Sequence, residues 1–259
     1  MPVFSFNRAI VRTPGRSVVH GLRDDPRAVP DHATILKEHA AYVAALTAAG
    51  VAVDVLEPLE AFPDSVFVED PALVFGEGAI LLRPGAPSRL GEREAMRAAL
   101  TRHFPTILEQ TDGFADGGDV LVTPDIVYIG LSARTNAIGA EALAAHLSAL
   151  GRRPIVAQTP HGVLHFKTAV SLIAEDTILA TPAMGAAGLF DRFRTIIAPP
   201  GEEAAANALR VNDTVFAGAH FPRTIDLLTS AGLRVVPLAV SEVAKLDAGL
   251  SCMSLRWHT

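Results

Sequence analysis

The chain has 259 residues, of which 49% are hydrophobic and 19% charged, so it can form a folded core and lacks the composition of a disordered protein. Its 22 Lys and Arg against 28 Asp and Glu leave a net charge of −6, without the overall basic field of a nucleic-acid-binding protein. The single cysteine, Cys252, excludes an internal disulfide and a cysteine-rich zinc or iron–sulfur site. These features predict a folded protein of a reducing compartment.

The sequence shows no targeting or membrane-spanning segment. Residues 1–16 lack the apolar stretch and small-residue cleavage site of a secretory signal. No stretch reaches about eighteen apolar residues without a charge or a proline. We therefore expect a cytoplasmic protein that neither spans nor binds a membrane.

The chain repeats one pattern of strand, turn, strand, helix and strand. An irregular first copy has a strand at 8–14, a long helix at 31–50 and a strand at 51–59. Strand–turn–strand units then recur at 72–85, 119–130, 169–184 and 208–219. Helices follow at 93–104, 139–151 and 221–232, with a much reduced helix in the fourth copy. Closing strands are expected at 105–110, 153–158, 190–199 and 233–238.

Five such units of about fifty residues would fill the chain almost completely. Because each unit has an apolar face that it cannot bury alone, a ring in which neighbours cover one another is favoured. An ordinary doubly wound sheet remains open on periodicity alone. No linker-like or charge-rich segment divides the chain, so we expect a single α/β domain over residues 1–259.

Cys252 has two interpretations, as a small buried hydrophobic residue or as a nucleophile served by a base elsewhere in the chain. His165, in VLHFKTAVSLI, is the most informative histidine because it is a polar residue among apolar ones at the entrance to a strand hairpin. His161 precedes it by four residues, but the intervening Gly162 and the lack of an HExxH glutamate argue against a zinc site. No acidic partner is identified for the other histidines: His20, His32, His39, His103, His146, His220 and His258.

The carboxylates are organised in two segments. Asp64, Glu69 and Asp70 interrupt an apolar strand predicted in PDSVFVEDPALVF, and Glu69 and Asp70 would project to opposite sides of its extended backbone. A carboxylate that points into an apolar layer requires a cation or hydrogen-bond donors. Asp116 and Asp119 flank two glycines before a strand, which allows a sharp turn and a close approach. A plain surface turn is the alternative for this second segment.

Two arginines, Arg89 and Arg134, each follow a predicted strand, where a guanidinium could grip a carboxylate in bidentate fashion. The segments FPDSVFVED, RPGAPSR, DGGDVL, GLSARTN, LHFK and LDAGLSCMS occur in this order between residues 62 and 254. In this combination the sequence closely resembles the dimethylarginine dimethylaminohydrolases of the guanidine-modifying (pentein) superfamily. The resemblance implies a five-bladed α/β propeller of ββαβ modules that hydrolyses methylated arginine to citrulline and a methylamine.

The resemblance also implies roles for individual residues. Cys252 would be the nucleophile, His165 the general acid and base, and Asp116 the acid that orients the histidine. The residues that would bind substrate are the carboxylates Asp70 and Glu69 at the guanidinium, Asp64 and the Leu246 carbonyl at the α-amine, Arg89 and Arg134 at the α-carboxylate, and Leu22 in a lid over the substrate. The implied chemistry needs no metal and no organic cofactor.

Three other functions are alternatives to this one. Arginine deiminases have the same chemistry, but they carry a second aspartate two residues after the histidine, where this chain has Lys167. The dimethylated nitrogen of a guanidinium carries no N–H for such a carboxylate to accept, so the lysine favours a methylated substrate. A deiminase of agmatine would leave Arg89 and Arg134 without a carboxylate ligand. A non-catalytic propeller that binds a cationic amino acid or a protein would not need Cys252, His165 and Asp116 together. The expected partner is a small molecule, and a homodimer is left open.

Overall fold

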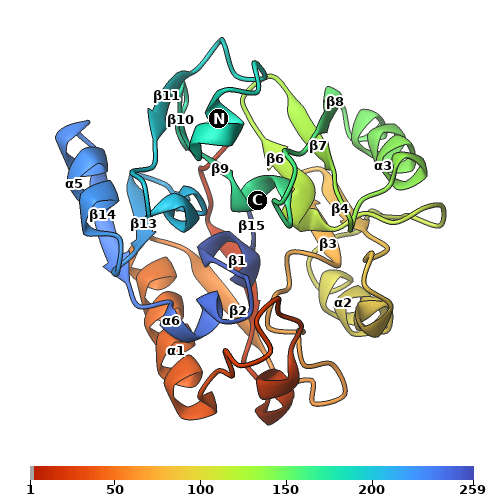
Figure 1. Cartoon of the computed structure of the whole chain (residues 1–259). Coiled ribbons are helices and arrows are strands. Elements are labelled where there is room, and N and C mark those ends of the chain that lie inside the picture. The colour runs from red at the N-terminus through yellow and green to blue at the C-terminus, as the bar shows by residue number, and fades with distance from the viewer. Residues whose placement is uncertain (1–2) are drawn as a thin grey trace.

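A computed structural model describes residues 3–259 of the chain. It contains five three-stranded sheets arranged around a common centre, with the longer helices on the outside (Figure 1). In each sheet the first two strands are antiparallel, and the third runs parallel to the second after a helical crossover. The expected propeller of five ββαβ modules is confirmed.

The strands are short, as suits modules of this size. In sheet order they are β15 (Leu255–Trp257), β1 (Arg8–Arg12) and β2 (Ala52–Leu56); β3 (Ala72–Phe75), β4 (Gly78–Leu81) and β5 (Ile107–Glu109); β6 (Val120–Val122), β7 (Val127–Leu131) and β8 (Pro154–Gln158); β9 (Val170–Ala174), β10 (Thr177–Ala180) and β11 (Arg194–Ile197); β12 (Leu209–Val211), β13 (Thr214–Gly218) and β14 (Arg234–Leu238).

Each module has one crossover helix. These are α1 (His32–Ala48), α2 (Glu92–Leu100), α3 (Ala137–Ala149), α4 (Pro182–Gly185) and α5 (Pro222–Ser230), and α6 (Ser241–Ala244) follows the last module. Side-chain caps set several N-termini: Asp31 accepts from the Thr34 N–H before α1, and Asn136 accepts from the Gly139 N–H before α3. The four residues of α4 are the reduced helix expected in the fourth copy.

The first module is irregular because its outer strand comes from the other end of the chain. Strand β15 pairs antiparallel with β1, with Arg8 opposite Trp257 and Ile10 opposite Leu255. The sequence between residues 8 and 59 therefore supplies only two strands of its sheet, and the C-terminus supplies the third. This pairing closes the ring.

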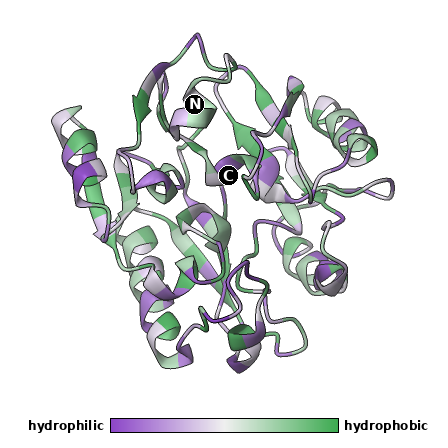
Figure 2. Ribbon diagram, in the orientation of Figure 1, coloured by the Kyte–Doolittle hydropathy of each residue, from purple (hydrophilic) through white to green (hydrophobic). Residues whose placement is uncertain are grey.

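Adjacent modules share their cores. The helix of one module packs between its own sheet and the sheet of the preceding module: Leu143 and Leu147 of α3, for example, pack against Ile80 of β4 as well as Ile129 of β7. Equivalent clusters lie at the other boundaries of the ring. The strands are largely hydrophobic, whereas the outer helices carry hydrophilic as well as hydrophobic residues (Figure 2). Each unit thus covers a neighbour, as the repeat pattern predicted.

Two local expectations are corrected. Residues 64–70 form consecutive turns and not a strand, with Phe67 N–H bonded to the Asp64 carbonyl and Ala72 N–H to the Glu69 carbonyl. His103 does have an acidic partner, since its Nε2 lies 2.9 Å from Asp54 of β2. That pair joins two modules, so local sequence could not reveal it. Within residues 3–259, no helix is long and apolar enough to cross a membrane.

Candidate active site

Loops from several modules enclose a cavity of about 210 Å³ at the centre of the ring. Cys252 lies in the 3-10 turn Leu250–Met253, His165 directly precedes the turn Phe166–Thr168, and Arg89 ends the turn Pro87–Arg89. The other side chains that line the cavity are Leu22, Arg23, Asp24, Asp64, Phe67, Asp70, Arg134, Leu164, Leu246, Asp247 and Ala248. Eight of the ten site residues of the sequence analysis line this cavity, and Asp116 contacts His165 and Arg134 of its wall. Glu69 is the exception described below.

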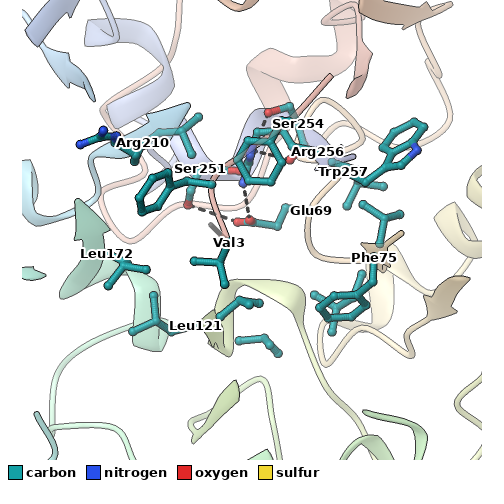
Figure 3. A pocket seen from close by; sticks show the side chains of 18 of the residues that line it. Val3, Glu69, Phe75, Leu121, Leu172, Arg210, Ser251, Ser254, Arg256 and Trp257 are labelled. Carbon is teal, nitrogen blue, oxygen red and sulfur yellow. Dashed lines mark hydrogen bonds and ion pairs between the residues drawn. The ribbon is translucent and has the colours of Figure 1, made fainter. Parts of the chain in front are cut away.

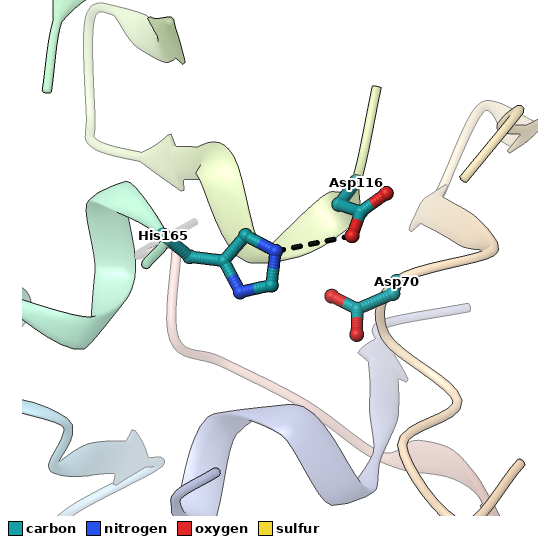
Figure 4. Close-up of side chains that lie close together, drawn as sticks. All are labelled: Asp70, Asp116 and His165. Atoms are coloured by element: carbon teal, nitrogen blue, oxygen red, sulfur yellow. Dashed lines mark hydrogen bonds and ion pairs between the residues drawn. The ribbon is translucent and has the colours of Figure 1, made fainter. Parts of the chain in front are cut away.

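His165 and Asp116 form the central pair of the site. The imidazole Nε2 lies 3.0 Å from Asp116 Oδ2, and the Gly85 N–H donates to Oδ1 at 2.7 Å (Figure 4). Burial lowers the pKa of His165, but the hydrogen bond to Asp116 and the charges of Asp70 and Asp119 outweigh burial and raise it to about 9. His165 is therefore an imidazolium at neutral pH, with Asp116 fixing its orientation.

The double glycine between Asp116 and Asp119 allows this close packing. A Cβ at Gly118 would lie 2.8 Å from the His165 ring and 3.0 Å from Asp70 Oδ1. Without that side chain, the Gly118 N–H reaches Asp70 Oδ1 at 3.1 Å. The glycine therefore provides both the space for the imidazole and a hydrogen bond to the carboxylate beside it.

Asp119 supports the histidine from behind. Its carboxylate accepts hydrogen bonds from Ser132 Oγ and Thr135 Oγ1, each at 2.7 Å, and from the Phe166 N–H at 2.8 Å. Burial raises the pKa of Asp119 despite the opposing charge of His165. These bonds connect the glycine turn, the loop after β7 and the residue that follows His165. Sequence reasoning singled out Asp119 but assigned it no role.

Asp70 and Arg89 form a buried ion pair beside the imidazole. Burial raises the pKa of Asp70, but the Arg89 and His165 charges exceed this effect and leave the pKa below its usual value. Arg89 also donates from Nε and Nη2 to both oxygens of Glu92, at 2.9 and 2.8 Å, and from Nη2 to the Phe67 carbonyl at 3.0 Å. Asp70 is thus an ionised carboxylate on the cavity wall.

The two arginines differ in the N–H groups that remain for a ligand. Arg89 is 3% exposed, and its contacts with Glu92, Asp70 and two carbonyls occupy nearly all of its five N–H donors. Arg134 makes one side-chain contact, from Nη1 to Asp116 Oδ2 at 3.4 Å. Of the pair, Arg134 therefore presents the more available guanidinium to the cavity.

Asp64 and Leu22 define another part of the wall. The Leu22 N–H donates to Asp64 Oδ1 at 2.9 Å, and the Leu22 side chain is 39% exposed at the cavity edge. Burial raises the pKa of Asp64 although Arg89 opposes that shift. The loop of Leu22 is also joined to the segment before Cys252, because the Asp24 N–H donates to Asp247 Oδ2 at 2.7 Å. Leu246 lines the cavity from that same segment.

Cys252 is buried, and the charges around it oppose its ionisation. Burial, followed by the negative charges of Glu69 and Asp70, raises the pKa of its thiol to about 11, against the lowering effects of the Gly249 backbone and Lys167. The resting site therefore holds a neutral thiol beside an imidazolium. A cation placed against the sulfur would favour the thiolate.

Glu69 faces away from this cavity and into a second one. Its carboxylate lies 2.5 Å from Lys167 Nζ and 3.4 Å from Arg256 Nη2, and it accepts from Ser251 Oγ at 3.2 Å (Figure 3). This second cavity, of about 610 Å³, is lined by Lys167, Ser251 and strand residues of all five sheets. Three sequence neighbours of site residues thus lie behind the Cys252 cavity: Glu69 beside Asp70, Ser251 beside Cys252, and Lys167 close to His165.

Potential metal ligands occur together at Asp70, Asp116 and His165, whose ligating atoms lie within 4.8 Å of one another. These carboxylates already contact Arg89, Arg134, His165 and the N–H groups of Gly85 and Gly118. The negative charges are therefore offset by protein cations and N–H donors. The arrangement matches a hydrogen-bonded ion network, and metal-free chemistry stays a prediction.

Sequence reasoning did not identify Asn207, whose Nδ2 lies 3.8 Å from Cys252 Sγ. It also missed Glu92, the main partner of Arg89, and the contact of Asp24 with Asp247. Glu92 lies three residues after Arg89, a spacing that could have indicated an ion pair. Asn207 lies in an alanine-rich stretch, and no pattern around it points to a thiol.

The fold and this site define a class of protein: a pentein propeller with a buried cysteine, a histidine–carboxylate pair and acidic residues around one central cavity. Residues 27–185 match the family model described as N,N dimethylarginine dimethylhydrolase, eukaryotic. The chain is 41% identical to the N(G),N(G)-dimethylarginine dimethylaminohydrolase of Pseudomonas aeruginosa over 97% of its length and 100% of the relative's. It is 35% identical to the Streptomyces coelicolor protein of the same name, over 96% of each chain. The chain belongs to the dimethylarginine dimethylaminohydrolase family.

Solved structures agree with this assignment. A Pseudomonas aeruginosa enzyme of this family, as a cysteine-to-serine variant with citrulline, superposes with a TM-score of 0.94 at 40% identity, covering 98% of this chain and 100% of the other. The N-terminal domain of ArgZ, an arginine dihydrolase from cyanobacteria, gives a TM-score of 0.85 at 19% identity over 96% of each chain. That second likeness concerns the fold alone.

Proposed function

We propose that this chain hydrolyses Nω-methylated L-arginine, either asymmetric dimethylarginine or monomethylarginine, to L-citrulline and dimethylamine or methylamine. The observation that carries the proposal is the convergence of Cys252, His165 and Asp70 on one cavity that also contains Asp64 and Arg134. Family membership and the citrulline complex of the relative support the same substrate class.

The cavity offers complementary charges to the substrate. Asp70, kept ionised by Arg89, lies where a guanidinium would be held against the thiol. Arg134 would bind the α-carboxylate, while Arg89 holds Asp70 in place through their ion pair. Asp64 and the Leu246 carbonyl would bind the α-amine. Leu22, exposed at the cavity edge, would cover the bound amino acid. Glu69 would act from behind the thiol through Ser251 and not on the substrate directly.

The protonation states suit the first half of the reaction. Binding of the cationic guanidinium favours loss of the Cys252 proton to solvent, which generates the nucleophile only in the complex. The thiolate attacks the guanidinium carbon and gives a neutral tetrahedral adduct. The His165 imidazolium donates its proton to the methylated nitrogen, the C–N bond breaks and the amine leaves, so that a covalent S-alkylthiouronium cation remains.

The second half uses the same histidine as a base. Neutral His165 accepts a proton from water, which attacks the thiouronium carbon. The neutral adduct then loses its hydroxyl proton to solvent as the C–S bond breaks, so citrulline forms, the thiolate is restored and His165 is again an imidazolium. Asp116 keeps the imidazole oriented in both steps. His165 thus carries the proton transfers to the amine and from water, and solvent takes up the protons lost by the thiol and by the second adduct.

The test is citrulline formation by the purified protein from asymmetric dimethylarginine, monomethylarginine and arginine, with Cys252→Ser and His165→Gln as paired variants. We expect methylarginine-dependent citrulline and an equal amount of amine, and no turnover by Cys252→Ser. No citrulline from the wild type, or unchanged turnover by Cys252→Ser, would overturn the mechanism. Faster turnover of arginine than of the methylated substrates would indicate a deiminase instead. Substrate binding without turnover would indicate a binding propeller.

The requirement for a reduced thiol also supports the predicted reducing, cytoplasmic location.

The proposal that residues 1–259 act as one domain is supported by the closure of the ring through β15 and β1.

A further inference from the structure

The loop that connects the fourth module to the fifth reaches the sulfur of Cys252. Asn207 follows the 3-10 turn Glu203–Ala206 and precedes β12, 45 residues before the cysteine. Its Nδ2 donates to Cys252 Sγ at 3.8 Å, and its Oδ1 accepts the Ser251 N–H at 3.2 Å. We infer that Asn207 is a positioning residue for the nucleophile: its carboxamide holds the Ser251–Cys252 backbone and directs an N–H at the sulfur. This inference rests on the proposed role of Cys252.

The Ser251 contact fixes the orientation of the carboxamide. A backbone N–H can only donate, so the atom that faces Ser251 must be the oxygen. The amide NH2 group is then the part that faces the sulfur. Because an N–H donor stabilises a thiolate more than a thiol, this orientation favours the reactive form of Cys252.

Gly249 makes room for this carboxamide. A Cβ at residue 249 would lie 2.5 Å from the Asn207 Cγ and 2.7 Å from its Nδ2. The carbonyl of the same glycine accepts the Cys252 N–H at 3.3 Å. The turn that presents the thiol is therefore shaped on one side to fit Asn207.

The chemistry explains why a neutral donor is suitable here. Glu69 and Asp70 oppose ionisation of the buried thiol, so the thiolate needs stabilising contacts. A lysine or arginine against the sulfur would supply them, but its charge would repel the guanidinium that must occupy the same place. An amide N–H stabilises the thiolate without that repulsion. Lys167, the nearby cation, is paired with Glu69 in the second cavity.

The decisive variant is Asn207→Asp. The carboxylate keeps the size of the side chain and can still accept the Ser251 N–H, but it replaces the N–H at the sulfur with a negative charge. Asn207→Ala removes the donor without adding charge. Asn212→Asp is the matched control, since the Asn212 side chain bonds backbone groups of Phe6 and Ala49, away from the site.

The measurement is the rate of Cys252 alkylation by iodoacetamide between about pH 7 and pH 11, followed by intact mass, together with kcat, KM and melting temperature. For Asn207→Asp we expect alkylation about tenfold slower at each pH of this range, which lies below the thiol pKa. Asn207→Ala should shift less in the same direction, and kcat should fall more than KM rises in both. Asn212→Asp should lower the melting temperature without moving the alkylation profile.

Two results would overturn the inference: wild-type alkylation profiles in both Asn207 variants, or equal profiles for Asn207→Asp and Asn207→Ala. If the alanine variant does not fold, the isosteric aspartate variant decides alone, because alkylation at the wild-type rate across this pH range rejects the inference. The alkylation rate reports the reactivity of the Cys252 thiol and does not depend on turnover of a substrate. A wild type that makes no citrulline would therefore reject the proposed function and leave this test valid.

Discussion

Lys167 Nζ lies 2.5 Å from Glu69 Oε1, and both side chains line the cavity behind the nucleophile. Lys167 thus makes no contact with the wall that would face a substrate leaving group. Lys167 favours a methylated substrate only because the position two residues after His165 carries no second carboxylate. The lysine itself acts on Glu69, and Ser251 joins Glu69 to the segment of Cys252.

Replacing Lys167 should therefore affect stability and the thiol together. Lys167→Met leaves the buried Glu69 with the Ser251 hydroxyl and, as a cation, the more distant Arg256, so the free energy of unfolding should fall by about 3 kcal/mol. The thiol pKa should rise, because Lys167 lowers it. Denaturant unfolding and thiol alkylation measure the two effects. The exposed pair of Arg234 and Asp213 provides the control, since Arg234→Met should leave both unchanged.

The two arginines should separate stability from substrate binding. Arg134→Gln should raise KM about tenfold or more with little change in melting temperature, because its guanidinium has N–H groups free for a carboxylate. Arg89→Met should instead lower the free energy of unfolding by about 3 to 5 kcal/mol, since it leaves Glu92 and Asp70 buried without their cation. Arg192→Gln, in an exposed pair, is the control for both. A stable Arg89→Met protein with only a raised KM would contradict this division.

Asp116→Asn tests the origin of the His165 charge. With the charged partner removed, the imidazole pKa should fall from about 9 toward its usual value, and kcat should drop about a hundredfold or more. NMR titration of His165 and the pH profile of kcat/KM measure these changes. If the imidazole still titrates near the wild-type value, the charges of Asp70 and Asp119 are sufficient to raise the His165 pKa without Asp116.

The same pair has a consequence for stability against pH. The folded-state pKa of His165 lies above its unfolded value, so its contribution is complete below about pH 6.5 and is lost as pH rises through about 9. The melting temperature of the wild type should decline across that window relative to the Asp116→Asn variant. If melting temperature changes with pH in the same way in both proteins, the His165–Asp116 pair is not the source of this stabilisation.

Closure of the ring can be tested at Trp257. This residue is 2% exposed and packs against Phe104 of the second module, with ring centroids 4.9 Å apart. Trp257→Ala should lower the free energy of unfolding by about 3 to 5 kcal/mol. Ile138→Ala, at a 62% exposed position, should have little effect. If the modules form one cooperative domain, fluorescence and circular dichroism should report a single unfolding transition in the wild type, and two separated transitions would exclude it.

The sequence by itself determined the repeat, because strand and helix patterns are local and each module reproduces them. It also singled out the residue types that the chemistry needs: the single cysteine, the histidine among apolar residues, and the DGGD turn, whose glycines allow a close approach. Six motifs in a fixed order identified the family. These are properties of short segments, and short segments can be read from sequence.

Only the tertiary structure decided which side chains face the same cavity. Glu69 and Asp70 are adjacent in sequence, yet the turns at 64–70 direct one behind the thiol and the other beside it. Arg89 and Arg134 each follow a strand in the sequence, but Glu92 and Asp70 take up most N–H donors of Arg89. Arg134 contacts Asp116 through one nitrogen and keeps its other N–H donors available for a ligand. Asn207 and the β15–β1 pairing depend on contacts between distant parts of the ring. Cys252, which composition alone could only exclude from disulfides and metal clusters, acquires its environment from these long-range contacts.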